Sequence, residues 1–236
     1  MQSLITRRAL LTSFATLPLA ACVSETARVR YKVIATVEVN NQPMEASTVM
    51  EVGYGRVKHS LVGTGGATKL YGEALLFDLP NGRSFYIMPF EHEKSGELSQ
   101  IWETAVLQTL GVKSSVGGLT DTDFSKIKGA SGRMPFRYFG RLPTFASFGD
   151  ETVPGSIFEF DPTKFNQVFP KVSFKGLEIE ITGEPVTDKI RNRLLWLNNS
   201  NTTQVFPRDP RKYTADRQKP LAYLINITSF YGNGSR

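Results

Sequence analysis

Apolar and polar positions in the first 90 residues follow a pattern that predicts two β-hairpins. The apolar runs that would form their strands are residues 31–39, 45–54, 69–79 and 84–90. Asn40-Asn41-Gln42-Pro43 joins the first two runs, and Pro80-Asn81-Gly82-Arg83 joins the other two. Asn-Gly between apolar runs is a strong hairpin signal, because both residues tolerate positive φ. Two successive hairpins predict an antiparallel sheet.

Two later segments carry the pattern of amphipathic helices. Residues 98–110 place apolar side chains three and four positions apart, and Gly111 ends that run. Thr187 is predicted to cap a second helix. The apolar face of this second helix comprises Ile190, Leu194 and Leu197.

The remaining pattern predicts short strands and one short helix. The strands are residues 156–160, 172–182 with a break at Gly176, and 221–231. Asp161-Pro162 is typical of a helix start, and an apolar face follows it up to Phe169. Residues 117–131 are polar and contain glycine, which predicts a loop, and residues 198–220 form a polar segment with prolines.

The predicted strands outnumber the predicted helices and do not alternate with them as in a parallel sheet. The expected fold is therefore α+β, mainly antiparallel β with two or three helices. The chain has 236 residues, 40% of them hydrophobic. This length and composition suit one β-rich domain, which we assign to residues 30–236.

The first 22 residues have the composition of an export signal. Arg7 and Arg8 precede an apolar run from Ala9 to Ala21, which is too short to span a bilayer. Leu19-Ala20-Ala21-Cys22 resembles the lipobox of bacterial lipoproteins. The resemblance implies cleavage between Ala21 and Cys22 and acylation of Cys22 with diacylglycerol and fatty acids such as palmitate. The polar composition that follows predicts a tether over residues 22–29. The alternative is a secretory signal that contains a cysteine by chance.

The sequence around the two arginines also resembles a twin-arginine export motif, so export by the Sec or the Tat route stays open. Val23 follows the cysteine. By resemblance to lipoprotein sorting in enterobacteria, a residue other than Asp at this position favours the periplasmic face of the outer membrane over the inner membrane. The expected location is the cell envelope, with a lipid anchor in the membrane. Two or three acyl chains would hold the protein there firmly, since each buried methylene contributes roughly 0.8 kcal/mol.

Charge and cysteine content narrow the expected partners. Cys22 is the chain's only cysteine, so its acylation would leave no thiol for a disulfide and the core alone would stabilise the fold. The net charge of +6 is compatible with an anionic membrane surface or a cell-wall polymer. Export argues against nucleic acid as a partner, and no cofactor is expected.

Several segments resemble a family of uncharacterised alphaproteobacterial proteins. The matching segments are Thr36–Val39, Val49–Val52, Gly72–Ala74, Asp78, Gly82-Arg83, Ile181–Thr187, Ile190, Arg193-Leu194 and Trp196-Leu197. This chain departs from the family at Met44-Glu45-Ala46, where a glycine-bearing turn is expected. Because the family has no assigned activity, the resemblance implies a shared fold and no function.

No combination of residues predicts a catalytic or metal site. His92 lies between Glu91 and Glu93, and strand alternation would turn it away from both carboxylates, so a metal would need His59 and distant carboxylates. Ser125-Lys-Ile-Lys128 matches a serine–lysine spacing without its companion motifs. We therefore assign no catalytic residue and no metal ligand.

Two carboxylate pairs and one glycine-rich segment have a simple structural interpretation. Alternation in strand 172–182 would point Glu178 and Glu180 to solvent, although a glycoside hydrolase could use such a pair. Asp121 and Asp123, in the predicted loop, are equally ambiguous. Gly63-Thr-Gly-Gly66 lacks the lysine of a phosphate-binding loop, which favours a flexible loop.

Two basic segments could contact a partner. Lys189 to Lys219 contains eight basic and two acidic residues, which suits either a solvated surface or anionic lipid headgroups. Arg133–Arg141 interleaves arginine with aromatic residues, a composition found in protein interfaces and also in cores.

The leading hypothesis is an envelope lipoprotein with a non-catalytic binding or scaffolding domain, whose partner is an envelope protein or a cell-wall polymer. The alternative is an envelope hydrolase that acts on peptidoglycan or glycan with carboxylates. A surface protein associated with a prophage or toxin is a third possibility. Two facing carboxylates in a cleft would distinguish the hydrolase from the binding domain.

Overall fold

The computed structural model describes residues 23–57, 68–93, 97–112, 119–198, 206 and 220–234. The predicted export signal, with Arg7, Arg8, Ala21 and Cys22, lies outside the described residues, and so do His59 and Gly63–Gly66. The described part has an α+β fold dominated by antiparallel strands, as predicted. It contains five α-helices, three of them only four residues long.

A five-stranded antiparallel sheet has the order β3-β2-β1-β11-β8. Its strands are β1 (Val23–Val39), β2 (Gln42–Val57), β3 (Thr68–Tyr71), β8 (Arg133–Pro135) and β11 (Val172–Ile181). β1 and β2 form the first predicted hairpin. Asn40 and Asn41 both have positive φ (50° and 64°), as a two-residue hairpin turn requires. The turn is therefore shorter than predicted, and Gln42 and Pro43 belong to β2.

β1 begins at Val23, so the predicted polar tether over residues 22–29 is wrong for the described part of that segment. Ala27 and Val29 are buried, at 4% and 5% exposure. Arg28 and Arg30 alternate with them and lie on the opposite face of the strand. Arg28, a polar residue of the predicted tether, thus lies on the outer face of a strand, because every second side chain points away from the core.

A four-stranded antiparallel sheet has the order β10-β9-β5-β4. Its strands are β4 (Leu75–Asp78), β5 (Ser84–Ile87), β9 (Phe145–Phe148) and β10 (Ile157–Phe160). The predicted Asn81-Gly82 hairpin joins β4 to β5, and β10 matches the strand predicted at 156–160. The predicted run 69–79 is split instead between β3 and β4, because Gly72 turns the chain with a φ of +121°.

The predicted helix over residues 98–110 starts four residues later than expected. Leu98–Gln100 forms β7, which pairs with β6 (Phe90–His92) in a two-stranded sheet. The helix α1 covers Trp102–Thr109, and Gly111 follows it with a φ of +65°, as its predicted stop.

The loop predicted over residues 117–131 contains a helix, α2 (Asp121–Lys128), so that prediction is wrong. Thr120 and Asp123 form a reciprocal capping box at its start. Phe124 and Ile127 are buried. The polar composition of the segment concealed a helix that needs only two apolar side chains to pack against the core.

The short helix predicted after Asp161-Pro162 is confirmed. The Asp161 carboxylate accepts a hydrogen bond from the Thr163 N–H, Pro162 opens the 3₁₀ turn η2 (Pro162–Lys164), and α3 (Phe165–Val168) follows. The predicted irregularity in β11 is confirmed as well. The register between β1 and β11 shifts opposite Gly176, so that the strand bends there.

The predicted C-terminal strand over residues 221–231 is wrong. That segment forms α6 (Leu221–Leu224) and the 3₁₀ helix η4 (Ile227–Phe230). With α4 (Ile190–Arg193), η3 (Leu195–Asn198) and η1 (Pro154–Ser156), they cover the four-stranded sheet. The side chains predicted as one apolar face, Ile190, Leu194 and Leu197, are all buried.

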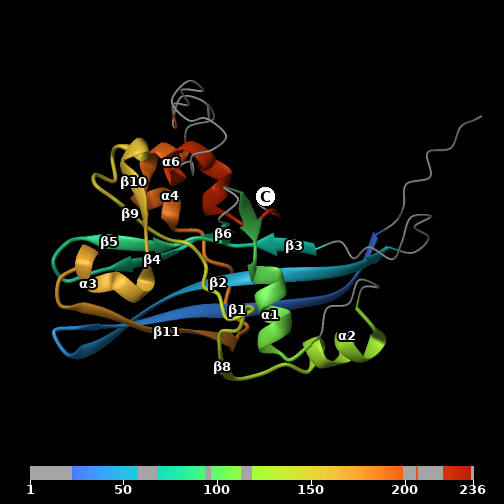
Figure 1. Cartoon of the computed structure of the whole chain (residues 1–236). Helices are drawn as coiled ribbons and strands as arrows, with labels where there is room; N and C mark the ends of the chain where they lie inside the picture. The colour runs from blue at the N-terminus through green and yellow to red at the C-terminus, as the bar shows by residue number, and fades with distance from the viewer. Residues whose placement is uncertain are drawn as a thin grey trace, which may run out of the picture.

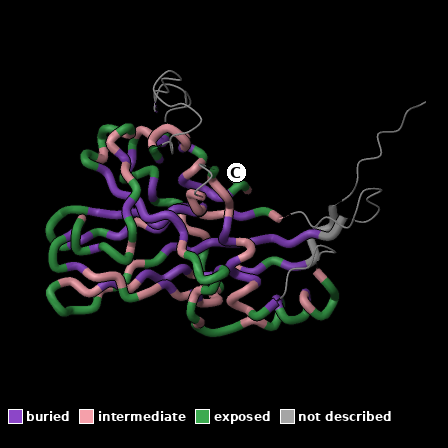
Figure 2. The backbone as a smooth tube through the Cα atoms, in the orientation of Figure 1, coloured by how far each residue is buried: buried purple, intermediate pink, exposed green. Residues whose placement is uncertain are grey.

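The molecule has three layers, with the four-stranded sheet in the middle. Figure 1 shows α4 and α6 on the opposite side of β4 and β5 from β1, β2 and β11. Every residue of β5 and β9 is buried, and these strands are purple in Figure 2. Phe85 of β5 stacks on Phe77 and meets Phe165 edge to face in the core between the sheets. Tyr86 faces the second core, beneath the helices.

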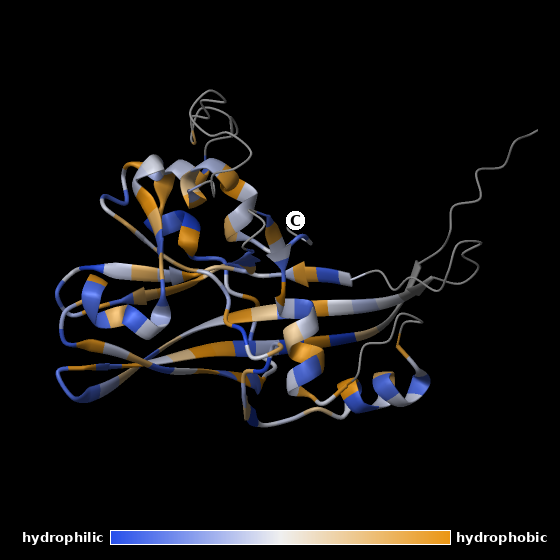
Figure 3. Cartoon of the chain, in the orientation of Figure 1, coloured by the Kyte–Doolittle hydropathy of each residue, from blue (hydrophilic) through white to orange (hydrophobic). Residues whose placement is uncertain are grey.

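The outer face of the five-stranded sheet is the face turned away from the core between the two sheets. Hydrophobic and polar residues alternate along its long strands (Figure 3). Tyr31, Met50 and Leu70 point into the core. Their neighbours along the strands therefore face outward, and these include the residues of the site described next.

Candidate functional site

A pocket of about 450 Å³ lies on the outer face of the five-stranded sheet. We call it the arginine–tyrosine pocket. The residues that define it are Arg30, Glu51, Tyr71, Asp188, Arg191 and Tyr231. Its volume falls within the ~300–1,000 Å³ typical of small-molecule sites.

The floor of the pocket is a row of three side chains on adjacent strands. Arg30 of β1 pairs in register with Glu51 of β2, and Glu51 pairs with Tyr71 of β3. Residues directly opposite each other in antiparallel strands project from the same face. The register of the sheet therefore fixes the order cation, anion and aromatic ring across the floor.

Glu51 is a buried carboxylate, 3% exposed, that holds two arginines in place. It accepts hydrogen bonds from Arg28 Nη1 (2.7 Å) and from Arg30 Nε and Nη2 (2.9 and 2.6 Å). A buried carboxylate is tolerated when such partners satisfy it. Both of its oxygens are occupied, so Glu51 positions the Arg30 guanidinium instead of acting as an acid or base.

One wall of the pocket is the segment of residues 182–188, which we call the crossing segment. The Thr182 N–H donates to the Arg30 carbonyl (3.0 Å), and Arg30 Nη1 donates to the Gly183 carbonyl (3.3 Å). At the far end, Thr187 exchanges two hydrogen bonds with the backbone of Val49. The crossing segment thus runs over β1 and β2. The prediction that Thr187 caps α4 is wrong, since its hydroxyl accepts the Val49 N–H instead.

Glu73 supplies the missing cap. Its carboxylate accepts hydrogen bonds from the N–H groups of Lys189 (2.8 and 2.9 Å) and Ile190 (2.9 Å) at the start of α4. Burial raises the pKa of the Glu73 carboxyl, and these backbone hydrogen bonds oppose the increase. No local sequence signal could reveal this cap, because Glu73 lies 116 residues before Lys189.

The opposite wall carries an arginine stacked on a tyrosine. Arg191 Nε donates to the Tyr231 hydroxyl (2.9 Å), and its guanidinium carbon lies 4.9 Å from the centre of the ring. Burial raises the pKa of the Tyr231 phenol, against the effect of Arg191. Within the described part of the chain, the terminal nitrogens of Arg191 and the carboxylate of Asp188 have no hydrogen-bond or ion-pair partner. Arg191 therefore presents a fixed, unoccupied donor pair.

Tyr231 reaches the pocket because residues 230–234 run alongside β3. The Ala74 N–H donates to the Phe230 carbonyl (2.8 Å), and the Gly232 N–H donates to the Gly72 carbonyl (3.0 Å). The approach is close: a Cβ atom on Gly232 would lie 2.3 Å from the Leu70 carbonyl oxygen. Residues 230–234 can lie this close to β3, and so bring Tyr231 to the pocket, because Gly232 has no side chain.

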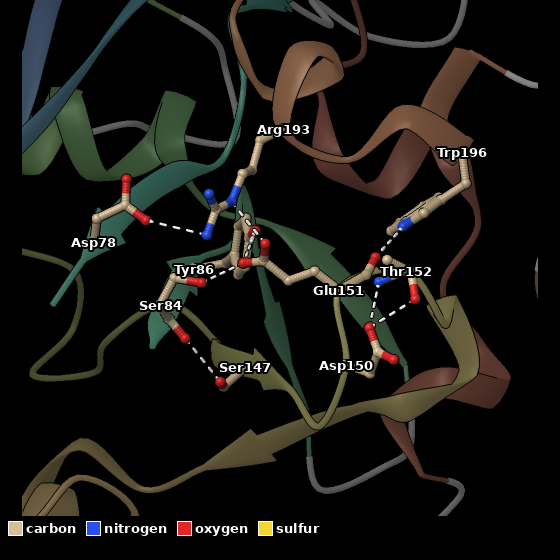
Figure 4. A network of polar contacts seen from close by, with 9 residues as sticks. All are labelled: Asp78, Ser84, Tyr86, Ser147, Asp150, Glu151, Thr152, Arg193 and Trp196. Carbon is tan, nitrogen blue, oxygen red and sulfur yellow. Dashed lines mark hydrogen bonds and ion pairs between the residues drawn. The ribbon is translucent and has the colours of Figure 1, made fainter. Parts of the chain in front are cut away.

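A second polar cluster, centred on Glu151, connects the layers (Figure 4). Glu151 accepts hydrogen bonds from the Ser84 hydroxyl, the Tyr86 hydroxyl (2.7 Å) and Arg193 Nε (2.6 Å). Its backbone carbonyl accepts from Trp196 Nε1 (2.8 Å). Burial, followed by the bond to Glu151, raises the pKa of the Tyr86 phenol far above its ordinary value. Because every member is engaged by another, we assign this cluster a structural role.

His92 Nδ1 lies 2.6 Å from the Glu159 carboxylate, within hydrogen-bond distance. The two residues border a second pocket of about 470 Å³. The other ring nitrogen, Nε2, is buried and has no partner among the described residues. Since Nε2 is closed off from solvent, it cannot reach a ligand in this conformation. Glu91 pairs with Arg141 and Glu93 with Ser99, so the flanking carboxylates do not join His92.

The structure separates the other residues that the sequence singled out. Glu178 and Glu180 point outward as predicted, and Glu178 pairs with Arg133. Asp121 and Asp123 begin α2 instead of facing each other in a loop. The Ser125 hydroxyl donates to the Asp121 carbonyl (2.9 Å) and not to Lys128.

The arginine-rich aromatic segment Arg133–Arg141 does not form one surface. Tyr138 is buried and Phe136 packs edge-on against Trp102, whereas Phe139 is exposed. Arg133 and Arg141 are engaged in ion pairs with Glu45, Glu178 and Glu91. Most of the segment therefore belongs to the fold. The basic segment Lys189–Lys219 is described only up to residue 198 and at Phe206, which is buried.

No group of three or more His, Cys, Asp or Glu side chains comes together among the described residues in a way that could bind a metal ion. None of the helices in the described ranges is long and apolar enough to cross a membrane. The pocket offers arginine, carboxylate and tyrosine side chains.

Comparison with family models, curated proteins and solved structures found no match for this chain. Function is therefore inferred below from the pocket and from the predicted export signal.

Proposed function

We propose that this chain is a lipid-anchored protein of the bacterial cell envelope whose domain binds a ligand without catalysis. The observation that carries the proposal is the arginine–tyrosine pocket. Arg30 is fixed by the buried Glu51, and Arg191 is fixed by Tyr231, before any ligand arrives. Groups that are held in place in advance lose little entropy on binding, which favours recognition.

The state of the carboxylates favours binding over hydrolysis. A carboxylate-dependent hydrolase needs two carboxyl groups that face the substrate, one as acid and one as base or nucleophile. Of the two carboxylates that border the pocket, Glu51 has both oxygens bound by arginines. Asp188 then stands alone on the wall, without a second carboxyl group to complete a catalytic pair in the described part of the pocket.

The sequence supports the location. The lipobox places the acylated residue at Cys22, immediately before β1 begins at Val23. A lipid on that residue would hold the domain close to the membrane surface with almost no linker. The binding domain would then act on a component of the envelope next to the membrane, either a protein or a cell-wall polymer.

Membrane fractionation of cells that express the full chain tests the anchor. We expect the wild-type protein in the membrane pellet, with an acylated N-terminal Cys22 by mass spectrometry. The Cys22→Ala variant should keep its signal peptide and lose the acyl group, and the control Ser24→Ala should behave like the wild type. Wild-type protein in the soluble fraction with an unmodified cysteine would overturn the proposal.

In vivo crosslinking of the same cells tests the binding role. A recurrent crosslinked envelope component that depends on Arg191 would support a binding protein. Release of glycan fragments from purified cell walls by the wild-type chain would instead support the hydrolase, and with it a different role for Asp188.

A further inference from the structure

We propose that the arginine–tyrosine pocket binds a neutral, polyhydroxylated ligand, namely a glycan segment of one or two sugar rings. This inference names the ligand class of the proposed binding function and therefore rests on it. It follows from three properties of the pocket: the balance of its charges, the pairing of free donors with a free acceptor, and the aromatic and apolar surface beside them.

The charges that line the pocket cancel. Two arginines, Arg30 and Arg191, stand against two carboxylates, Glu51 and Asp188. The Arg30 guanidinium is bound directly to Glu51, which also binds Arg28 outside the lining of the pocket. An anionic ligand would meet the Asp188 carboxylate on the wall, and a cationic ligand would meet Arg191. A neutral ligand pays neither electrostatic penalty.

The wall of α4 places unoccupied donors near an unoccupied acceptor. Arg191 is bound to Tyr231 only through Nε, which leaves its two terminal nitrogens to donate. The Asp188 carboxylate lies three residues earlier on the same segment and accepts no hydrogen bond from any described residue. A hydroxyl group donates and accepts at once, so vicinal hydroxyls can satisfy both side chains together.

The floor supplies a surface for the body of a sugar. Tyr71 is half-buried, and Pro185 and Val186 of the crossing segment face the same space. Sugar rings carry apolar C–H faces beside polar hydroxyl edges. This pocket matches that division, with tyrosine and aliphatic groups beside charged groups.

Titration of the full chain, purified in detergent, with chitotriose in its neutral, fully N-acetylated form tests the proposal by calorimetry. We expect saturable binding of chitotriose and none of inorganic phosphate. Arg191→Ala and Asp188→Ala should each weaken binding by about tenfold or more, since each removes a hydrogen bond to a charged group. Asp188 is exposed, so its variant should fold normally. Arg137→Ala removes an exposed arginine outside the pocket and should leave binding unchanged.

Three outcomes would overturn the inference: binding of phosphate without the saccharide, saccharide binding that Arg191→Ala and Asp188→Ala leave unchanged, and no saccharide binding by a folded chain. The anchor is judged separately by fractionation. A soluble, unacylated chain that binds chitotriose through Asp188 would support the glycan site and overturn the lipid anchor. An acylated chain that binds no saccharide would overturn the glycan site alone.

Discussion

Phe139 has a backbone conformation that disfavours its own side chain. Its φ is +46°, in the left-handed region, and 67% of the residue is exposed. For a bulky residue this conformation costs roughly 1–2 kcal/mol. A residue distant in sequence stabilises the turn, because the Phe139 N–H donates a hydrogen bond to the Gln108 side chain (2.9 Å). The tertiary contacts around the turn thus impose a conformation that the residue alone would not choose.

Replacement of Phe139 by asparagine should therefore stabilise the protein. Asparagine tolerates the left-handed region, and little buried surface is lost, so we expect the free energy of unfolding to rise by about 0.5–1 kcal/mol. Urea denaturation followed by circular dichroism measures the change. Phe136→Asn is the control: it should destabilise, because Phe136 packs against Trp102. A loss of stability in Phe139→Asn would show that the exposed ring contributes packing.

Position 232 requires glycine because there is no room for a side chain, and not because of its backbone conformation. A Cβ there would lie 2.3 Å from the Leu70 carbonyl oxygen, so Gly232→Ala must displace residues 230–234 from β3. We expect a loss of about 1–3 kcal/mol in thermal or urea unfolding, and weaker binding at the pocket through Tyr231. Gly155→Ala is the matched control, since its Cβ would meet nothing within 4 Å. Equal stability of the two variants would contradict the close approach.

At the scale of elements, α4 shows how a helix start can depend on a distant residue. The helix has four residues, so its own hydrogen bonds cannot hold it. Its first N–H groups bond to the buried carboxylate of Glu73, which precedes β4. The same bonds fix the end of the crossing segment and the orientation of Arg191 in the pocket.

Removal of this cap should destabilise the C-terminal layer. Glu73→Ala leaves the Lys189 and Ile190 N–H groups without an acceptor, which costs about 1–3 kcal/mol. Glu73→Gln keeps one acceptor oxygen and should lose less. Denaturant unfolding at neutral pH measures both variants. If the alanine variant were as stable as the wild type, water or another side chain would have to replace the cap.

The raised pKa of Glu73 gives its contribution a pH dependence with a defined sign. Its pKa in the folded protein lies above the ordinary value of 4.5, so the folded state binds the proton more tightly than the unfolded chain. The stabilisation from protonated Glu73 is fully present below pH 4.5 and is lost as pH rises through the raised pKa. The stability of the wild type relative to Glu73→Gln should fall over that range. The opposite trend would contradict a raised pKa.

At the scale of the whole molecule, polar clusters connect the layers. Hydrophobic packing is non-directional, whereas the hydrogen bonds of such a cluster fix the relative position of the layers. Glu151, on the turn between β9 and β10, binds Ser84 and Tyr86 of β5 and Arg193 of α4. Figure 4 shows these side chains converging on one carboxylate. The middle sheet and the C-terminal helices are thereby fixed in relative position.

Glu151→Ala should cost about 2–3 kcal/mol in the free energy of unfolding. The variant leaves the partly buried Tyr86 hydroxyl without its acceptor and removes an ion pair to Arg193. Equilibrium urea unfolding is the measurement. Glu184→Ala, which breaks an exposed pair with Lys32, is the control and should change stability by less than about 1 kcal/mol. Equal effects would contradict a structural role for the cluster.

Much of the fold could be predicted from sequence patterns that span only a few neighbouring residues. The Asn40-Asn41 and Asn81-Gly82 turns, the cap at Asp161 and the stop at Gly111 all depend on residues adjacent in the chain, and all four form at the predicted places, the first turn being shorter than predicted. Two of the errors share one cause. The segment that contains Arg28 was predicted as a tether, and residues 121–128 were predicted as a loop, because sequence composition does not show which side chains have a core to face.

The sequence by itself determined the antiparallel α+β class, the two hairpins and the apolar faces of the short helices, because period and turn chemistry act within a few residues. It also carries the lipobox at Cys22, which stays a prediction. Only the tertiary structure decided the site. The pocket joins Arg30, Glu51, Tyr71, Asp188, Arg191 and Tyr231. Nothing local links these residues. They meet because strand register and the burial of the C-terminal layer bring distant segments onto one face of the sheet.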